Sequence, residues 1–379
     1  MSDNIVVEQV AICLQTNTPF HWVEVPGVGK TVITQLLSSG LGLKSWCFVL
    51  SHYEPTVFGW PAPDLADNAL RFLPHRKFVE IARDASDNQW WTIFADELST
   101  CTAAQQRPGL KLFHERNLAD FQLPMETRIA AASNPPEVAT GGRAISPPMA
   151  NRVLWIYGPP SREAWYDGML TGFRPPQFKR VPKDWREHLP HTRALVVAAL
   201  RKFPQFLDRE GFPNDESKQC GPYPSRRSWS DLFVPTYTAA SLLGDKDLTY
   251  TLACGAVGEA AAGTVLHWIN EQDIPDIPEL VRNPKKFKMP KSDDRLYVIL
   301  SCVVAECARE CPEGEKLNKE QISIWLNCWS LFDMCAPTKA NIVHPFVDKL
   351  GKFLHASRPV PDTQSRELVK MLTRFREAK

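Results

Sequence analysis

The residues best suited to chemistry form a glycine-rich loop near the start of the chain. The loop follows an apolar segment, precedes a helical pattern, and reads Val25-Pro26-Gly27-Val28-Gly29-Lys30-Thr31. In such a loop, successive backbone N–H groups and the positive end of the helix face a phosphate group. The lysine neutralises phosphate charge and the threonine hydroxyl coordinates Mg²⁺. The pattern therefore predicts a site for ATP and Mg²⁺, with the nucleotide bound by Pro26, Gly27, Val28, Gly29, Lys30 and Thr31.

One position departs from the usual form of this loop, G-x-x-x-x-G-K-[ST]. Glu24 replaces its first glycine. The glycines and the Lys-Thr pair that make the close contacts to phosphate are retained, so the change weakens the sequence match more than the chemistry. Two alternatives stay open: a chance glycine-rich turn, and a nucleotide-binding scaffold that does not hydrolyse its ligand.

Two acidic residues end a later apolar segment. Trp91-Thr92-Ile93-Phe94-Ala95 precedes Asp96 and Glu97. After a phosphate loop, the first acid is expected to hold the Mg²⁺ shell and the second to polarise the attacking water. The alternative is that Asp96 only caps the following helix. The preceding loop favours the catalytic interpretation, with Thr31 and Asp96 as metal ligands and Glu97 as the base.

A third polar group follows another apolar segment. Residues 128–132 lead into Ser133 and Asn134, whose side chain could sense the γ-phosphate and orient the water. Further on, Arg152 ends a short helix that Ser146-Pro147-Pro148 opens.

The four segments VEVPGVGKT, IFADELST, IAAASNPPE and SPPMANRV together resemble the MoxR-type branch of the AAA+ ATPases. The resemblance covers residues 1 to about 160 and continues more weakly through Tyr223-Pro-Ser-Arg-Arg-Ser-Trp229. It implies that Asn134 is sensor 1 and that Arg152 is an arginine finger, which reaches the nucleotide of a neighbouring subunit. Arg227, or Arg226 beside it, would be sensor 2. Such arginines stabilise charge in phosphoryl transfer, which is worth about 10³–10⁵ in rate.

Two further segments resemble hairpins of that branch. The first runs from Val57-Phe58-Gly59-Trp60 to Leu73, and the second from Arg116 to Leu123. An exposed Phe58-Gly59-Trp60 tip could grip a partner. The alternative, that Phe58 and Trp60 cover the sheet edge, is equally compatible with the sequence.

The elements that must position these residues form an α/β pattern. Short apolar segments at 21–25, 45–50, 91–95, 128–132 and 153–157 predict a mainly parallel sheet, and residues 30–39 predict a helix. Proline-rich breaks separate this part from helical patterns at 192–203, 254–268, 296–309, 319–334, 341–356 and 362–377. We therefore predict a P-loop AAA+ domain over 1–160, an α-helical lid over 161–273 and a helical C-terminal extension over 274–379.

Composition excludes several classes of protein. The 44 lysines and arginines nearly balance 43 acids, for a net charge of +1, which argues against a surface devoted to nucleic acid or an anionic membrane. No apolar run is long enough to span a bilayer, and no signal peptide is visible. Together with cysteines placed in apolar runs, these features predict a cytoplasmic protein with reduced thiols.

The expected function is therefore ATP hydrolysis by a ring, most often a hexamer in this class, that remodels, assembles or activates a partner protein. The resemblance implies a partner with a von Willebrand factor A domain. The alternative is a nucleic-acid motor or restriction-type NTPase. The sequence does not distinguish ATP from GTP, since no base-pocket motif is readable.

Overall fold

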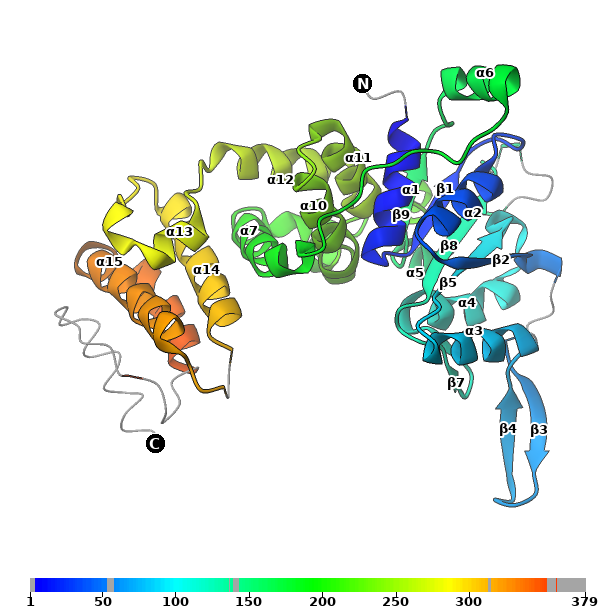
Figure 1. Ribbon diagram of the computed structural model, residues 1–379, viewed down its shortest axis with the longest axis horizontal. Coiled ribbons are helices and arrows are strands. Elements are labelled where there is room, and N and C mark those ends of the chain that lie inside the picture. The colour runs from blue at the N-terminus through cyan, green and yellow to red at the C-terminus, as the bar shows by residue number, and fades with distance from the viewer. Residues whose placement is uncertain are drawn as a thin grey trace. The chain divides into compact units, whose positions relative to one another are not determined.

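The computed structural model describes residues 4–52, 58–135, 137–138, 143–312, 315–352 and 359 (Figure 1). The chain forms two compact units: residues 1–185 with 205–264, and residues 186–204 with 265–379. These units are defined by contacts within the chain, and the three-domain division expected from the sequence stays a prediction.

The first unit is built on one parallel sheet. Its strands lie in the order β2-β5-β8-β1-β9, and every neighbouring pair is parallel. Their bounds are β1 (Phe20–Val23), β2 (Lys44–Val49), β5 (Trp91–Asp96), β8 (Arg128–Ser133) and β9 (Leu154–Tyr157). All five predicted strands are confirmed to within two residues at each end. Short, mostly apolar strands suit this position because helices cover both faces of such a sheet.

Helices pack on the sheet through alternating strand residues. Ile93, Ala131 and Trp155 join the helices α3 (Arg76–Ser86), α4 (Ala103–Glu115) and α5 (Pro147–Ala150) in one buried cluster. The helices α1 (Ile5–Thr16) and α2 (Lys30–Gly40) contact the strands as well. The helix predicted at 30–39 is confirmed as α2. The mixed α/β fold class is likewise confirmed.

Two hairpins leave the sheet layer. β3 (Trp60–Asp64) pairs antiparallel with β4 (Ala69–Leu73) and projects from the domain (Figure 1), while β6 (Asn117–Leu118) pairs with β7 (Phe121–Gln122). Phe58 is buried, whereas Trp60 is 61% exposed. Of the two alternatives for Phe58-Gly59-Trp60, the exposed tip is wrong: this segment lies at the base of the hairpin, and the turn follows Asp64. Val57 lies outside the described residues.

After β9 the chain forms α6 (Arg162–Thr171) and an extended strap over residues 172–184. The strap is fixed to helices of the same unit. The backbone N–H of Lys179 donates to Glu8 Oε2 at 3.1 Å, and that of Val181 donates to Gln15 Oε1 at 3.0 Å. Lys179 Nζ pairs with Asp245 at 2.7 Å. Lys179 is thus used to hold the strap to helices of its own unit.

Helices complete the first unit. They are α8 (Asp208–Gly211), α9 (Glu216–Gln219), the π-helical segment η6 (Ser228–Phe233), α10 (Val234–Ser241), α11 (Lys246–Val257) and the start of α12 (Glu259–Glu271). The single helix predicted at 254–268 is wrong. Gly258 has φ +82° and separates α11 from α12, because glycine tolerates this left-handed conformation.

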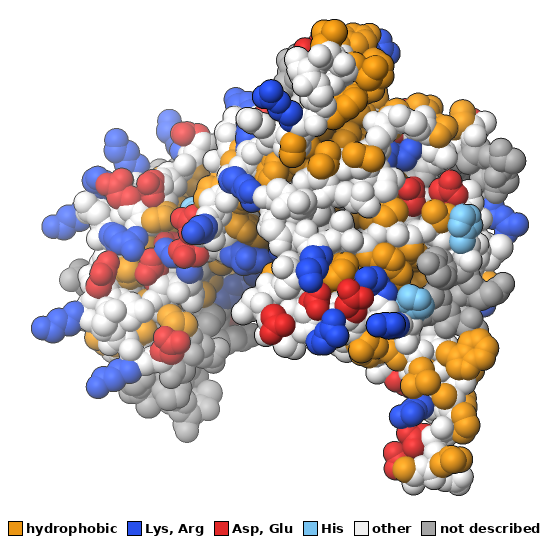
Figure 2. All heavy atoms as spheres, turned by 45° about the vertical axis from the view of Figure 1, so that its right-hand side comes forward, with side chains coloured by type: hydrophobic (Ala, Val, Ile, Leu, Met, Phe, Trp, Pro, Cys, Tyr) orange, Lys and Arg blue, Asp and Glu red, His pale blue; other side chains and the backbone are white. Residues whose placement is uncertain are grey.

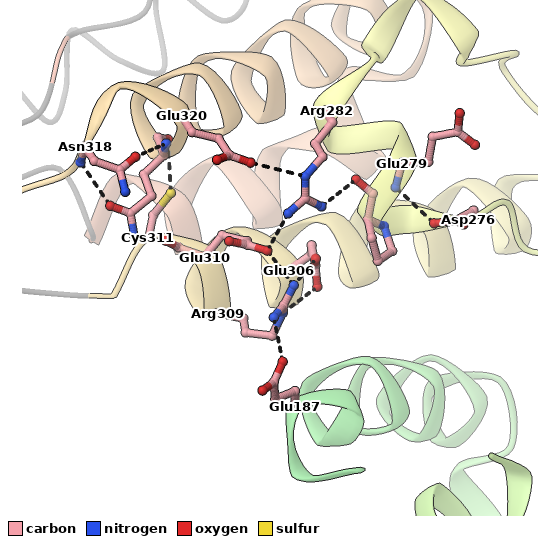
Figure 3. Close-up of polar contacts among 12 residues, drawn as sticks. Glu187, Asp276, Glu279, Arg282, Glu306, Arg309, Glu310, Cys311, Asn318 and Glu320 are labelled. Carbon is pink, nitrogen blue, oxygen red and sulfur yellow. Dashed lines mark hydrogen bonds and ion pairs between the residues drawn. The ribbon is translucent and has the colours of Figure 1, made fainter. Parts of the chain in front are cut away.

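The second unit is helical in its described part. It contains α7 (Leu189–Lys202), α13 (Ile277–Arg282), α14 (Asp293–Glu310) and α15 (Lys319–Lys352), which is kinked at Lys339. Figure 3 shows Arg309 of α14 among acids: it pairs with Glu306 at 2.7 Å and with Glu187 at 3.2 Å. The helix predicted at 362–377 lies outside the described residues. None of the described helices is long and apolar enough to cross a membrane.

Candidate nucleotide-binding site

The site residues predicted from the sequence meet at one edge of the sheet. The glycine-rich loop follows β1, Asp96 is the last residue of β5 and Glu97 follows it, and Asn134 follows β8. These three strands are parallel and adjacent, with β8 between β1 and β5. Their carboxyl ends therefore lie side by side, which is where open α/β sheets bind ligands.

The loop owes its shape to two glycines. Gly27 has φ +85° and Gly29 has φ +92°, which residues with a Cβ rarely adopt. Gly29 directly precedes α2, so the loop enters the positive end of an 11-residue helix. Backbone N–H groups at a helix N-terminus favour an anion such as phosphate. The local geometry therefore matches the phosphate cradle expected from the sequence.

Lys30 is held inside this loop by three oxygen atoms. Its Nζ donates to the carbonyls of Glu24 at 2.6 Å and Val25 at 3.1 Å, and to Asn134 Oδ1 at 3.0 Å. The residue is only 7% exposed, and this burial lowers the pKa of Lys30, while Asp96 opposes the shift. The bond to Asn134 brings two predicted site residues from different strands into direct contact.

Thr31 and Asp96 form the second contact between predicted residues. Thr31 Oγ1 donates to Asp96 Oδ2 at 2.7 Å, and Asp96 Oδ1 accepts the backbone N–H of Glu97 at 2.9 Å. A hydroxyl and one carboxylate are oxygen ligands that suit Mg²⁺, which usually takes few protein ligands beside phosphate oxygens and water. The two side chains therefore fit the metal that the sequence predicted.

Glu97 stands in an unusual backbone conformation. Its φ of 56° and ψ of 39° lie in the left-handed region, which is sparsely populated by residues other than glycine. The carbonyl of Glu97 accepts from the backbone N–H of Thr100 at 3.0 Å and from its hydroxyl at 2.8 Å, which holds the turn. The turn places a half-buried carboxylate directly after the strand that ends in Asp96.

Arg152 lies at the opposite edge of the sheet. It follows α5 and precedes β9, whose first residue, Leu154, pairs with Phe20 at the start of β1. The glycine-rich loop comes after Val23, at the other end of that strand. Arg152 Nη1 donates to the Pro148 carbonyl at 2.6 Å, and its Nε is buried without a partner among the described residues.

The two candidate sensor arginines have different surroundings. Arg226 is exposed and pairs with Asp208, with Nη2 at 2.7 Å from Oδ2. Arg227 is close enough to Arg152 for their positive charges to repel. Burial lowers the pKa of Arg152, and the charge of Arg227 lowers it further. Arg227 therefore shares the edge of the sheet with Arg152, and the structure does not bring it together with the glycine-rich loop of its own chain.

Sequence reasoning missed several groups around the site. Ser225 Oγ donates to Asn151 Oδ1 at 2.7 Å, which ties the start of η6 to the residue before Arg152. His114 also lies near the arginines: burial lowers its pKa, and Arg227 and Arg152 lower it further. These residues come from distant parts of the chain, and no spacing in the sequence connects them.

The sheet order, the helical cover and the polar residues at three strand ends define a mixed α/β domain built on a five-stranded parallel sheet. No protein-family model and no curated protein sequence matches the chain. Among solved structures it is similar to a protein from Cytophaga hutchinsonii that carries a provisional assignment as an ATPase. That structure shares 13% sequence identity over 69% of this chain and 88% of its own, with a TM-score of 0.44.

Proposed function

We propose that the protein is a Mg²⁺-dependent ATPase. The observation that carries the proposal is the meeting of five groups at one strand edge: Lys30 bonded to Asn134, Thr31 bonded to Asp96, and Glu97 directly after Asp96. Chance glycine-rich turns have no reason to gather a lysine, a hydroxyl, two acids and an amide from three strands. Phosphoryl transfer uses this set of groups.

Each group has a role that its position permits. The loop N–H groups and Lys30 would bind the phosphates, and Lys30 would exchange its three internal acceptors for phosphate oxygens. Thr31 and Asp96 would hold Mg²⁺, which supplies neutralisation of charge on the β- and γ-phosphates when bound. Glu97 would accept a proton from the attacking water, and Asn134 would orient that water.

Arg152 supports a site shared between copies of the chain. It lies at the edge of the sheet opposite to its own loop, so it has no route to its own nucleotide. We infer that this cation serves a nucleotide bound to a neighbouring copy. Because every copy carries both edges, the contact is head to tail, and head-to-tail contacts form a ring when the rotation between copies closes. We therefore propose a homo-oligomeric ring of the MoxR type, hexameric by resemblance.

The β3–β4 hairpin supports work on another protein. Its exposed apolar side chains are visible along the projecting arm in Figure 2 and include Trp60, Leu65, Leu70, Phe72 and Leu73. Contiguous exposed apolar surface marks interaction sites in soluble domains. We propose that hydrolysis remodels or assembles a partner protein, and that a von Willebrand factor A domain is the first partner to try.

The proposed function is tested by measuring ATP hydrolysis over a series of protein concentrations. Wild type, Glu97→Gln, Arg152→Ala and an equal mixture of the two variants are compared. Specific activity should rise steeply with concentration because neighbours complete the site. Each variant alone should be inactive, and the mixture should recover turnover, since a Glu97→Gln copy can lend its arginine to an Arg152→Ala neighbour.

Other outcomes would contradict the proposal in distinct ways. Activity that is flat with concentration, with Arg152→Ala unaffected, would remove the shared site and the ring. Absence of turnover at every concentration, with ATP still bound, would indicate a nucleotide-binding scaffold. Stimulation by DNA or RNA and not by a protein would favour the nucleic-acid motor.

A further inference from the structure

His21 lies on β1 between β8, whose carboxyl end leads to Asn134, and β9, which begins two residues after Arg152. It is 1% exposed, and its register partners are Ala131 on β8 and Trp155 on β9. Paired residues of neighbouring strands point to the same face, and so does the residue two positions further along a strand. The imidazole therefore lies between Trp155 and Ser133, which is two residues beyond Ala131.

The first contact of His21 leads toward the glycine-rich loop. His21 Nε2 and Ser133 Oγ form a buried hydrogen bond of 2.7 Å. Ser133 is the last residue of β8 and directly precedes Asn134, whose Oδ1 accepts from Lys30. A bond at this point fixes the end of the strand from which Asn134 extends.

The second contact leads toward Arg152. The rings of His21 and Trp155 lie 4.7 Å apart between centroids at 71°, an edge-to-face arrangement. Trp155 Nε1 donates to the carbonyl of Ala150 at 3.0 Å. Ala150 ends α5, two residues before Arg152. The imidazole therefore supports the indole that holds the end of α5.

We propose that His21 is a positioning residue that orients Asn134 through Ser133 and Arg152 through Trp155. One side chain thus supports the half-site for the chain's own nucleotide and the half-site for a neighbour's nucleotide. The inference rests on the proposed ATP hydrolysis at a shared site. Histidine suits the position because it combines an aromatic ring with a hydrogen-bonding nitrogen. Burial and the nearby Lys30 also lower the pKa of His21 to about 3, so the ring is neutral at pH 7.

Two substitutions separate the contacts. His21→Phe keeps a ring against Trp155 but removes the bond to Ser133. His21→Gln places an amide nitrogen the same number of bonds from Cβ as Nε2, so it keeps the bond to Ser133 but removes the ring. Trp22→Phe is the matched control, because Trp22 is the next residue on β1, is fully buried and points to the other face.

The experiment uses mixtures in which each copy provides one half-site. An Arg152→Ala copy provides the loop side, and a Glu97→Gln copy provides the arginine side. His21→Phe should lower turnover about threefold to tenfold when placed in the Arg152→Ala copy, and leave it unchanged in the Glu97→Gln copy. His21→Gln should show the reverse pattern. Trp22→Phe should alter neither mixture.

A reduction of equal size in both mixtures for each His21 variant would overturn the proposal, because loss of general stability has no preferred side. No reduction in either mixture would overturn it as well. Loss of turnover in the mixture without His21 changes would instead reject the shared site of the proposed function.

A binding measurement decides the contact with Ser133 even without turnover. Affinities for ADP and for a non-hydrolysable ATP analogue are measured by fluorescence on the full chain. His21→Phe should lower the preference for the analogue about threefold, since Asn134 would face the γ-phosphate, while His21→Gln should keep it. An unchanged preference in His21→Phe would overturn this part of the proposal.

Discussion

The two edges of the parallel sheet satisfy their charges in different ways. At the carboxyl edge, Lys30 has three oxygen acceptors and Thr31 is bonded to Asp96. At the amino edge, Arg152 and Arg227 repel each other, and Arg152 Nε is buried without a partner among the described residues. The first edge is complete within one chain. At the second edge Glu115 opposes the lowering of the Arg152 pKa, but Arg152 forms no ion pair among the described residues, as the proposed contact with a neighbour's nucleotide requires.

Replacing Arg152 has the largest expected effect on turnover. If turnover did not fall, the proposed difference between the two edges of the sheet would be wrong. Arg152→Ala should lower kcat about 10³-fold or more, because a planar cation no longer stabilises the charge of phosphoryl transfer. Nucleotide affinity of the diluted protein should stay unchanged. Steady-state hydrolysis and nucleotide titration measure both, with Arg107→Ala, an exposed arginine of α4, as the control. A loss of affinity in the diluted protein would place Arg152 at its own chain's nucleotide.

Replacing Lys30 should lower nucleotide affinity, which replacing Arg152 should leave unchanged in the diluted protein. Lys30→Ala should weaken nucleotide binding about 10²-fold, because the cation that faces the phosphates is lost. The effect should be independent of protein concentration, since the loop belongs to one chain. Titration with a fluorescent nucleotide measures it, and the exposed Lys111→Ala on α4 serves as the control. Equal affinities for Lys30→Ala and wild type would rule out the phosphate loop.

Replacing Arg226 and Arg227 separately tests which of them acts at the same edge of the sheet as Arg152. Arg227→Ala should lower kcat about 10- to 100-fold, the range expected for loss of one charge-assisted hydrogen bond. Arg226→Ala should stay within about twofold, because Arg226 is already paired with Asp208 and exposed. Mixing Arg227→Ala with Glu97→Gln at equal amounts tests the side on which Arg227 works. Recovery of turnover would place it with Arg152, and no recovery would place it with its own loop.

The smallest effect concerns stability and pH. The pKa of His21 falls from the usual 6.5 to about 3 through burial and Lys30. Below pH 6.5 the unfolded chain therefore binds a proton that the folded chain does not, and stability falls as the pH drops toward 3. Relative to His21→Gln, wild type should lose about 2 kcal/mol of unfolding free energy between pH 7 and pH 5. Urea unfolding at both pH values measures this difference, and parallel curves would contradict the buried neutral imidazole.

The residues at the carboxyl edge were predictable from the sequence because each polar residue directly follows its own strand along the chain. Apolar segments that end in Gly-Lys-Thr, Asp-Glu or Ser-Asn show both the strand and the polar residue at its end. The five strands and α2 followed from the same periodicity. The break at Gly258 was missed, because a glycine in an alanine-rich run fits a helix equally well until its φ is known.

The sequence by itself determined which side chains could handle a phosphate and on which strands they lie. It did not determine the order of the strands in the sheet or the contacts between side chains on different strands. The order β2-β5-β8-β1-β9 decided those contacts, because pairing between strands distant in the chain brings Asn134 to Lys30 and leaves Arg152 on the far side. The choice of Arg227 over Arg226 as the arginine beside Arg152, and the place of His21 between Ser133 and Trp155, also depended on the tertiary fold. Such contacts join residues that only packing brings together, so no spacing along the chain records them.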